Sequence, residues 1–233
     1  MIVTDGLVQQ SVPDVLRPDA GLVLMSQWDV PDGPERRRTV MDGTIEAWEQ
    51  HPLPEGFLSR VAFEGTDQKT IFNYAQWTSV EAHREFAQNP ANQEGLTPRI
   101  VAIAGPVGTP GKYELYRSLR AKETPAVPGC IVAVTFDTDG PETARKFVDT
   151  LVEHFGEEQP GNEDGGIASH FHIHLDGSRV VNYSEWTSPE AHEEMVRTQL
   201  QEGSEIMKLV GSIEGLHPQG FRRFLPYRGL YRP

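Results

Sequence analysis

Apolar and polar positions follow the same pattern twice along the chain. Each half opens on an apolar segment with the composition of a strand, 22–28 or 130–136. Apolar residues at helical spacing come next, and those of the second half lie 107 positions after those of the first. These matched positions are Val40, Met41, Ile45 and Trp48 in the first half, and Phe147, Val148, Val152 and Phe155 in the second.

Two more strands, a second helix and a last strand are expected in each half. Asp-Gly between the paired strands of the second half is a strong hairpin signal. The expected strands are 57–65, 70–77 and 112–118 in the first half, and 167–175, 179–186 and 221–228 in the second. Asp-Gly-Pro-Glu opens the first helix of each half at 32–35 and 139–142. Asp is a good N-cap, and Glu three residues later suggests a capping box.

The most similar segments of the two halves join a strand to a helix. Residues 71–86 are IFNYAQWTSVEAHREF, and residues 180–195 are VVNYSEWTSPEAHEEM. Asn, Tyr, Trp, Thr, Ser, Glu, Ala and His recur in the same order, 109 positions apart and without an insertion. A Thr or Ser would cap the helix that follows, with Pro189 in its first turn.

The order β-α-β-β-α-β in each half predicts an α+β fold of two tandem ferredoxin-like halves. One face of each sheet would be covered by helices, and the bare faces would be buried by packing sheet to sheet, as a dimeric α+β barrel within one chain. The alternative is two independent domains on a linker. The expected divisions are an N-terminal arm, 1–20, a first domain, 21–117, a linker, 118–129, and a second domain, 130–233.

Strand alternation places the repeated Asn and Trp on one face of the sheet. Asn73 therefore points the same way as Trp77, and Asn182 the same way as Ser184 and Trp186. An Asn on a buried face is unfavourable unless its amide is hydrogen-bonded. Two explanations stay open: a structural amide beside a core indole, or an amide and an indole N–H that face a ligand cavity.

Three histidines alternate along one strand of the second half. His170, His172 and His174 share a face, and the first half has Val61, Phe63 and Gly65 at these positions. The histidines could lie on a hydrated face, hold a metal with help from another segment, or line a pocket as a general base. His83 and His192, in the second helix of each half, are expected to be structural or exposed.

Composition narrows the function classes. Hydrophobic residues make up 37% of the 233 residues, which is enough for a packed core, and the formal net charge of −13 argues against a nucleic-acid partner and an anionic membrane surface. The N-terminus lacks the features of a signal peptide, and no apolar run is long enough to span a bilayer. Cys130 is the only cysteine, which excludes an intrachain disulfide and, with the missing signal peptide, suggests the cytoplasm. The chain has no P-loop, G-x-G-x-x-G, H-E-x-x-H or G-x-S-x-G motif.

The repeated N-x-x-x-W followed by T-S-x-E-A-H resembles the antibiotic biosynthesis monooxygenase family, here as a tandem pair covering 22–117 and 130–228. The resemblance implies a dimeric α+β barrel. It also implies oxidation of a polycyclic aromatic polyketide by O2, of the anthrone or phenol to quinone type, without metal or flavin. Asn182 would bind the developing oxyanion, Trp186 would supply an aromatic wall and an N–H, and His172 would assist proton transfer.

Asn73 and Trp77 are the corresponding catalytic candidates of the first half, where activity is undecided. The candidate substrate-binding residues are Trp28, Arg99, His170, His174 and Ser184. The expected partner is a small aromatic polyketide, and association of two tandem chains into a homodimer is left open. Two alternatives share the fold: a haem-degrading oxygenase with His83 or His192 as the haem ligand, and a barrel that binds a ligand or a partner without catalysis.

Overall fold

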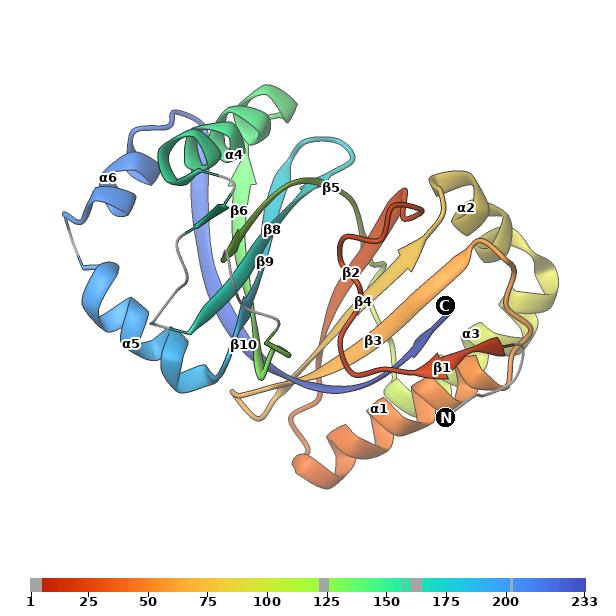
Figure 1. Cartoon of the computed structure of the whole chain (residues 1–233). Coiled ribbons are helices and arrows are strands. Elements are labelled where there is room, and N and C mark those ends of the chain that lie inside the picture. The colour runs from red at the N-terminus through yellow and green to blue at the C-terminus, as the bar shows by residue number, and fades with distance from the viewer. Residues whose placement is uncertain (1–5, 122–125, 157, 160–164, 202) are drawn as a thin grey trace. The chain divides into compact units, whose positions relative to one another are not determined.

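The computed structural model describes residues 6–121, 126–156, 158–159, 165–201 and 203–233 (Figure 1). Residues 1–5 of the expected N-terminal arm and 122–125 of the expected linker lie outside the described residues. So do 157 and 160–164 in the loop between the second half's first helix and next long strand, and 202.

The elements follow the order expected from the repeat, with one further helix and one two-residue strand in each half. Those of the first half are β1 (Val8–Gln9), β2 (Leu22–Asp29), α1 (Pro34–Glu49), β3 (Phe57–Gly65), β4 (Thr70–Trp77), α2 (Val80–Gln88), α3 (Pro90–Ala104) and β5 (Gly111–Ala121). Those of the second half are β6 (Cys130–Thr138), α4 (Pro141–Phe155), β7 (Glu158–Gln159), β8 (Gly166–His174), β9 (Arg179–Trp186), α5 (Pro189–Gln199), α6 (Glu205–Gly211) and β10 (Leu216–Tyr231).

The chain forms two compact units, Met1–Lys112 with Leu225–Pro233, and Tyr113–Phe224. In the first unit β4 lies between β2 and β3, antiparallel to both, and the end of β10 pairs with β1. In the second unit β9 lies between β6 and β8 in the same way, β6 also pairs with the start of β10, and β8 pairs with β5. The predicted α+β fold of two tandem ferredoxin-like halves is confirmed. The packing of one sheet on the other stays a prediction.

Strand β5 is longer than the sequence predicts. The expected strand ends at residue 118, where the expected linker begins, but residues 119–121 continue the strand to Ala121. Ser118, Leu119 and Arg120 pair with His170, Ser169 and Ala168 of β8, so their backbone groups are satisfied in a ladder despite their polar composition.

The first helix of each half begins one residue later than the capping-box interpretation requires. Gly33 and Gly140 are the N-caps, with φ of 93° and 152°, and neither helix has a side-chain cap. The prediction that Asp caps these helices is wrong. The second-helix caps are confirmed, because the hydroxyls of Ser79 and Ser188 accept from the backbone N–H of Ala82 and Ala191.

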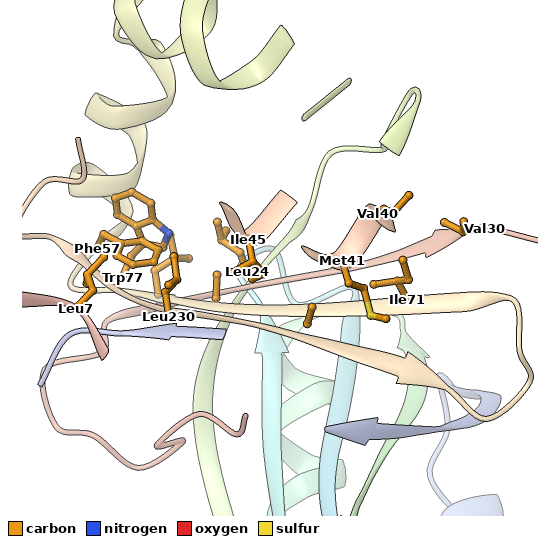
Figure 2. Packing of buried hydrophobic residues seen from close by; sticks show 13 residues of the cluster. Leu7, Leu24, Val30, Val40, Met41, Ile45, Phe57, Ile71, Trp77 and Leu230 are labelled. Carbon is orange, nitrogen blue, oxygen red and sulfur yellow. The ribbon is translucent and has the colours of Figure 1, made fainter. Parts of the chain in front are cut away.

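The core of the first unit joins α1 to one face of its sheet. Met41 and Ile45 of α1 pack with Leu24 of β2 and Trp77 of β4, and Leu230 of β10 belongs to the same cluster (Figure 2). Side chains two apart share a face, so Asn73 lies on this helix-covered face too. In the second unit α4 packs likewise on Phe171, Ile173 and Val180.

Candidate functional site

A cavity of about 270 Å³ lies in the first unit between the sheet and its helices. Trp28, Trp48, Trp77 and Phe86 supply much of its aromatic lining. The buried polar side chains in the lining are those of Arg60 and Asn73, whereas Ala87, Val101 and Gly108 are exposed and mark its outer side. An apolar cavity with a few convergent polar groups is the usual form of a small-molecule site.

Four of the lining residues carry a buried nitrogen without a hydrogen-bond partner. These atoms are Nε1 of Trp28, Nη1 of Arg60, Nδ2 of Asn73 and Nε1 of Trp77. All four are N–H donors. A buried donor left unsatisfied costs about 1–3 kcal/mol, so these residues offer N–H groups that a ligand or ordered water can complete. A ligand that bonds to them would do so through acceptor atoms.

Arg60 fixes the orientation of the Asn73 amide. Its Nη2 lies 2.9 Å from Oδ1 of Asn73, across the β3–β4 pair. A guanidinium can only donate, so the amide oxygen must face Arg60 and the NH2 group is left free. Strand alternation correctly groups Asn73 with Trp77, but Arg60, which orients the amide, is not among the expected site residues.

Arg60 could have been found from the alternation of β3. It is the only charged residue between Phe57 and Phe63, and it lies on the strand face of Ala62, which pairs with Asn73. The expected basic contact, Arg99, is exposed on α3 and donates to Oε1 of Gln50 at 2.7 Å. It is not one of the described residues that line the cavity.

The corresponding positions of the second unit form a polar network of their own. Nε1 of Trp186 donates to Oγ of Ser184 at 2.9 Å, and Nδ2 of Asn182 donates to Oγ of Ser169 at 3.4 Å. Ser169 and Ser184 are themselves 3.3 Å apart. Ser169 stands where the first unit has Arg60, and Phe136 stands where it has Trp28. Hence the structure brings Asn182, Ser184 and Trp186 together, but with the indole N–H already satisfied.

The three alternating histidines lie on the opposite face of the second sheet. Asn182 pairs with Phe171, which packs under α4, whereas His172 pairs with Val181. The structure therefore does not bring His172 together with Asn182, and His172 is not on the sheet face from which it could assist proton transfer beside that residue.

Each of these histidines has a local partner. His170 Nδ1 lies 2.9 Å from Oγ of Ser118, and His172 Nδ1 lies 3.0 Å from the backbone oxygen of His170. Burial, with the nearby His170, lowers the pKa of His172 to about 3. His174 Nδ1 lies 2.5 Å from Oδ1 of Asp176 at the hairpin. Their arrangement is that of structural side chains.

Solved structures with the same fold were found by structural comparison. A protein described as anthrone oxidase-like is 16% identical, with a TM-score of 0.71, over 97% of this chain and 96% of that one. A putative monooxygenase from Fusobacterium nucleatum is 12% identical, with a TM-score of 0.57, over 91% of this chain and 95% of its own. The chain has the tandem ferredoxin-like fold of these proteins. The resemblance inferred from the two N-x-x-x-W segments is confirmed at this level.

A shorter match is more similar in sequence. The Streptomyces coelicolor monooxygenase from the gene ActVA-Orf6, solved with nanaomycin D, is 30% identical over 43% of this chain and 89% of its own, with a TM-score of 0.34. The sequence matches no protein-family model and no curated protein.

Two further histidines, His83 and His192, contact the repeated tryptophans. The rings of Trp77 and His83 are 5.2 Å apart, and those of Trp186 and His192 are 5.0 Å apart, both edge to face. Nδ1 of His192 accepts from Nε of Arg223 at 2.9 Å. Neither histidine lines the cavity as far as the described residues define it. The haem alternative stays a prediction, and neither of the two histidines proposed to bind the iron lies in this cavity's described lining.

No group of three or more His, Cys, Asp or Glu in the described part of the chain could hold a metal ion. Over the same residues, no helix is long and apolar enough to cross a membrane.

Proposed function

We propose that the cavity of the first unit is the active site of a monooxygenase that oxidises a phenolic polycyclic aromatic compound with O2, of the anthrone to quinone type, in antibiotic biosynthesis. The observation that carries the proposal is the pair of buried, unpartnered donors, Nδ2 of Asn73 and Nε1 of Trp77, in an aromatic-lined cavity. The fold shared with the anthrone oxidase-like protein is consistent with it.

The proposed reaction needs no external reductant. The ring carbon that becomes the quinone carbonyl loses two hydrogens, one atom of O2 stays on that carbon, and the other leaves as water. The substrate thus supplies all the electrons, after it has lost a proton and become electron-rich. The protein's task would be to hold the flat substrate, exclude water and stabilise the negative charge on its oxygen.

Asn73 and Trp77 fit this task by position and chemistry. The Asn73 NH2 group is held in place through its oxygen by Arg60, so its donors are preorganised before a substrate enters. Trp77 is fully buried and packs edge to face on Phe57, with ring centroids 5.5 Å apart (Figure 2). Its indole therefore combines a rigid wall with one N–H donor.

The side chains that line the cavity also support the proposal that no metal takes part. As far as it is described, it contains no imidazole, thiolate or carboxylate, which are the side chains that usually bind redox metals. We therefore propose O2 as the co-substrate and no resident cofactor.

The test is oxidation of an anthrone by metal-stripped protein, under air and under nitrogen, followed by quinone absorbance and O2 uptake. We expect acceleration over the spontaneous reaction under air only, with one O2 consumed per quinone. Asn73→Ala should lower kcat about 10²-fold, the usual effect of removing one oxyanion donor. Quinone formation at the spontaneous rate by folded protein that still binds the anthrone would support a non-catalytic binding protein instead. Activity that returns only with added metal or haem would contradict the cofactor proposal.

A further inference from the structure

Arg60 is a buried cation without a buried anion. Its side chain belongs to a residue that is only 4% exposed, and burial lowers its pKa to about 10, so it stays charged at neutral pH. Its hydrogen bonds go to Oδ1 of Asn73 at 2.9 Å and Oγ1 of Thr44 at 3.5 Å, and Nη1 has no partner. Both acceptors are neutral, and no ion pair joins Arg60 to any described carboxylate.

Another buried arginine of the same unit shows the usual arrangement. Arg37 is 2% exposed, and its Nη2 lies 3.2 Å from the carboxylate of Glu64. Buried charges in proteins are almost always paired in this way, because an isolated ion is strongly disfavoured in a low-dielectric interior. Arg60 lacks such a partner among the described residues, and its side chain lines the cavity.

The surroundings of Arg60 keep its charge available to a ligand. The guanidinium lies 5.8 Å from the ring centroid of Trp28 and 5.7 Å from that of Trp48. Aromatic faces attract a cation without consuming its N–H donors. Nη1 therefore stays free, next to the NH2 group that Arg60 itself orients on Asn73.

We infer that the cavity binds its aromatic ligand as an anion, with an ionised ring hydroxyl, a phenolate or enolate oxygen, against Nη1 of Arg60 and Nδ2 of Asn73. The inference rests on the proposed function for the location of the site and the aromatic nature of the ligand. Arg60 is then a binding residue that selects the ionised form, so the site lowers the pH at which the ligand loses its proton. The second unit has Ser169 at this position and no such cation there.

The probe for this inference is 1,8-dihydroxyanthraquinone, a phenol that is already a quinone and whose visible absorbance reports its ionisation. Bound to the protein, it should ionise about one pH unit or more below its value in free solution, as expected for an acid beside a buried cation. Arg60→Met should abolish the shift, and Arg60→Lys should keep part of it. Arg38→Met, on the exposed surface of α1, removes the same charge and should leave the shift unchanged.

A dimethyl ether of the probe, which cannot ionise, separates charge from shape. It should bind wild-type protein and Arg60→Met with affinities within about twofold of each other, which also shows that the variant's cavity is intact. A bound probe that ionises at its solution pH overturns the inference, whatever the variants do, and so does a shift that survives in Arg60→Met. Because the probe is not oxidised, a shifted probe with no anthrone turnover would support the anion site and contradict the oxygenase.

Discussion

The same residue presents opposite groups in the two halves. In the first unit the amide oxygen of Asn73 is bound to Arg60 and its NH2 is free, whereas in the second Nδ2 of Asn182 is bound to Ser169 and its oxygen is free. Arg60 can only donate, so it fixes the Asn73 amide with the NH2 group left free, whereas the Ser169 hydroxyl can donate or accept and does not fix the amide of Asn182. A developing oxyanion needs a donor, so we assign the proposed chemistry to the first half.

The two repeated tryptophans allow a crossed prediction. Trp77→Phe removes an unpartnered N–H and should lower kcat on an anthrone about 10²-fold. Its free energy of unfolding should fall only by the effect of the smaller ring, because no hydrogen bond is lost. Trp186→Phe removes the hydrogen bond to Ser184 and should lower the free energy of unfolding by about 1 kcal/mol. Its effect on kcat should be smaller than that of Trp77→Phe. Urea unfolding and steady-state kinetics of both variants check this. A larger kcat loss at Trp186 would contradict the assignment of the site to the first unit.

Two buried histidines of the second unit predict how stability depends on pH. Burial lowers the pKa of His172 to about 3, and burial with the charge of Arg223 lowers that of His192 to about 4. In the unfolded chain both histidines have a pKa near 6.5. Between that pH and the lower pKa of the folded protein, the unfolded chain therefore holds more protons than the folded state. The contribution of the two neutral histidines to the free energy of unfolding is therefore complete above pH 6.5. It is lost as the pH falls, by about 1.4 kcal/mol per histidine and pH unit.

Urea unfolding at pH 7.5 and pH 5.5 measures this loss, above the range in which carboxylates titrate. We expect wild-type protein to lose about 3 kcal/mol over this interval. His192→Gln keeps an acceptor for Arg223 but cannot be protonated, and it should lose about half as much. An equal loss in both proteins would show that His192 does not titrate in this window.

At the scale of elements, the sequence predicts order and type well and faces only in part. Alternation correctly groups Asn73 with Trp77, but every residue of β4 is buried, so hydrophobicity cannot show which of its faces meets the helices. The same limit applies to β8, where the buried histidines look like a site although their face lies away from α4. The hydrogen bond between Arg60 and Asn73 joins neighbouring strands, so alternation can place Arg60 on the face of Asn73, but the bond itself follows only once the register of β3 and β4 is known.

The last strand of the chain stabilises the unit that contains the cavity. Leu230 is fully buried in the first unit's core (Figure 2). Arg228 donates to the carboxylate of Glu49 at 2.9 Å. We expect Leu230→Ala to lower the free energy of unfolding by about 2–4 kcal/mol, as for other buried leucines. Leu225→Ala, at a residue that is 38% exposed, should change it by about 0.5 kcal/mol or less.

Intrinsic fluorescence during urea unfolding is a suitable measurement, because Trp28, Trp48 and Trp77 all lie in the first unit. The fluorescence midpoint of Leu230→Ala should move to lower urea. Equal midpoints for Leu230→Ala and Leu225→Ala would mean that this end of β10 adds little to the unit.

At the scale of the whole molecule, the duplication has kept the fold and changed the site. Each half retains the Asn, the Trp and the capped helix of the repeat, but the set of free donors belongs to the first. In the second, the hydroxyl of Ser184 accepts from the indole N–H of Trp186. Two identical active sites would need the same neighbouring side chains in both halves. These neighbours differ, because Ser169 stands in place of Arg60 and Phe136 in place of Trp28.

This difference predicts one high-affinity aromatic ligand per chain, whatever the number of chains in the assembly. Calorimetric titration with 1,8-dihydroxyanthraquinone should give a stoichiometry of about one, since among the described residues the four free donors and the unpaired cation all belong to the lining of the first unit's cavity. Ala75→Phe, which places a ring into the cavity, should remove this binding, and Ser184→Phe is the matched change in the second unit and should spare it. Two equal sites per chain would mean that the second half binds as well, and loss of binding in Ser184→Phe alone would assign the ligand to the second half. In either case the bonded Trp186 and Asn182 would have to release their serine partners on binding.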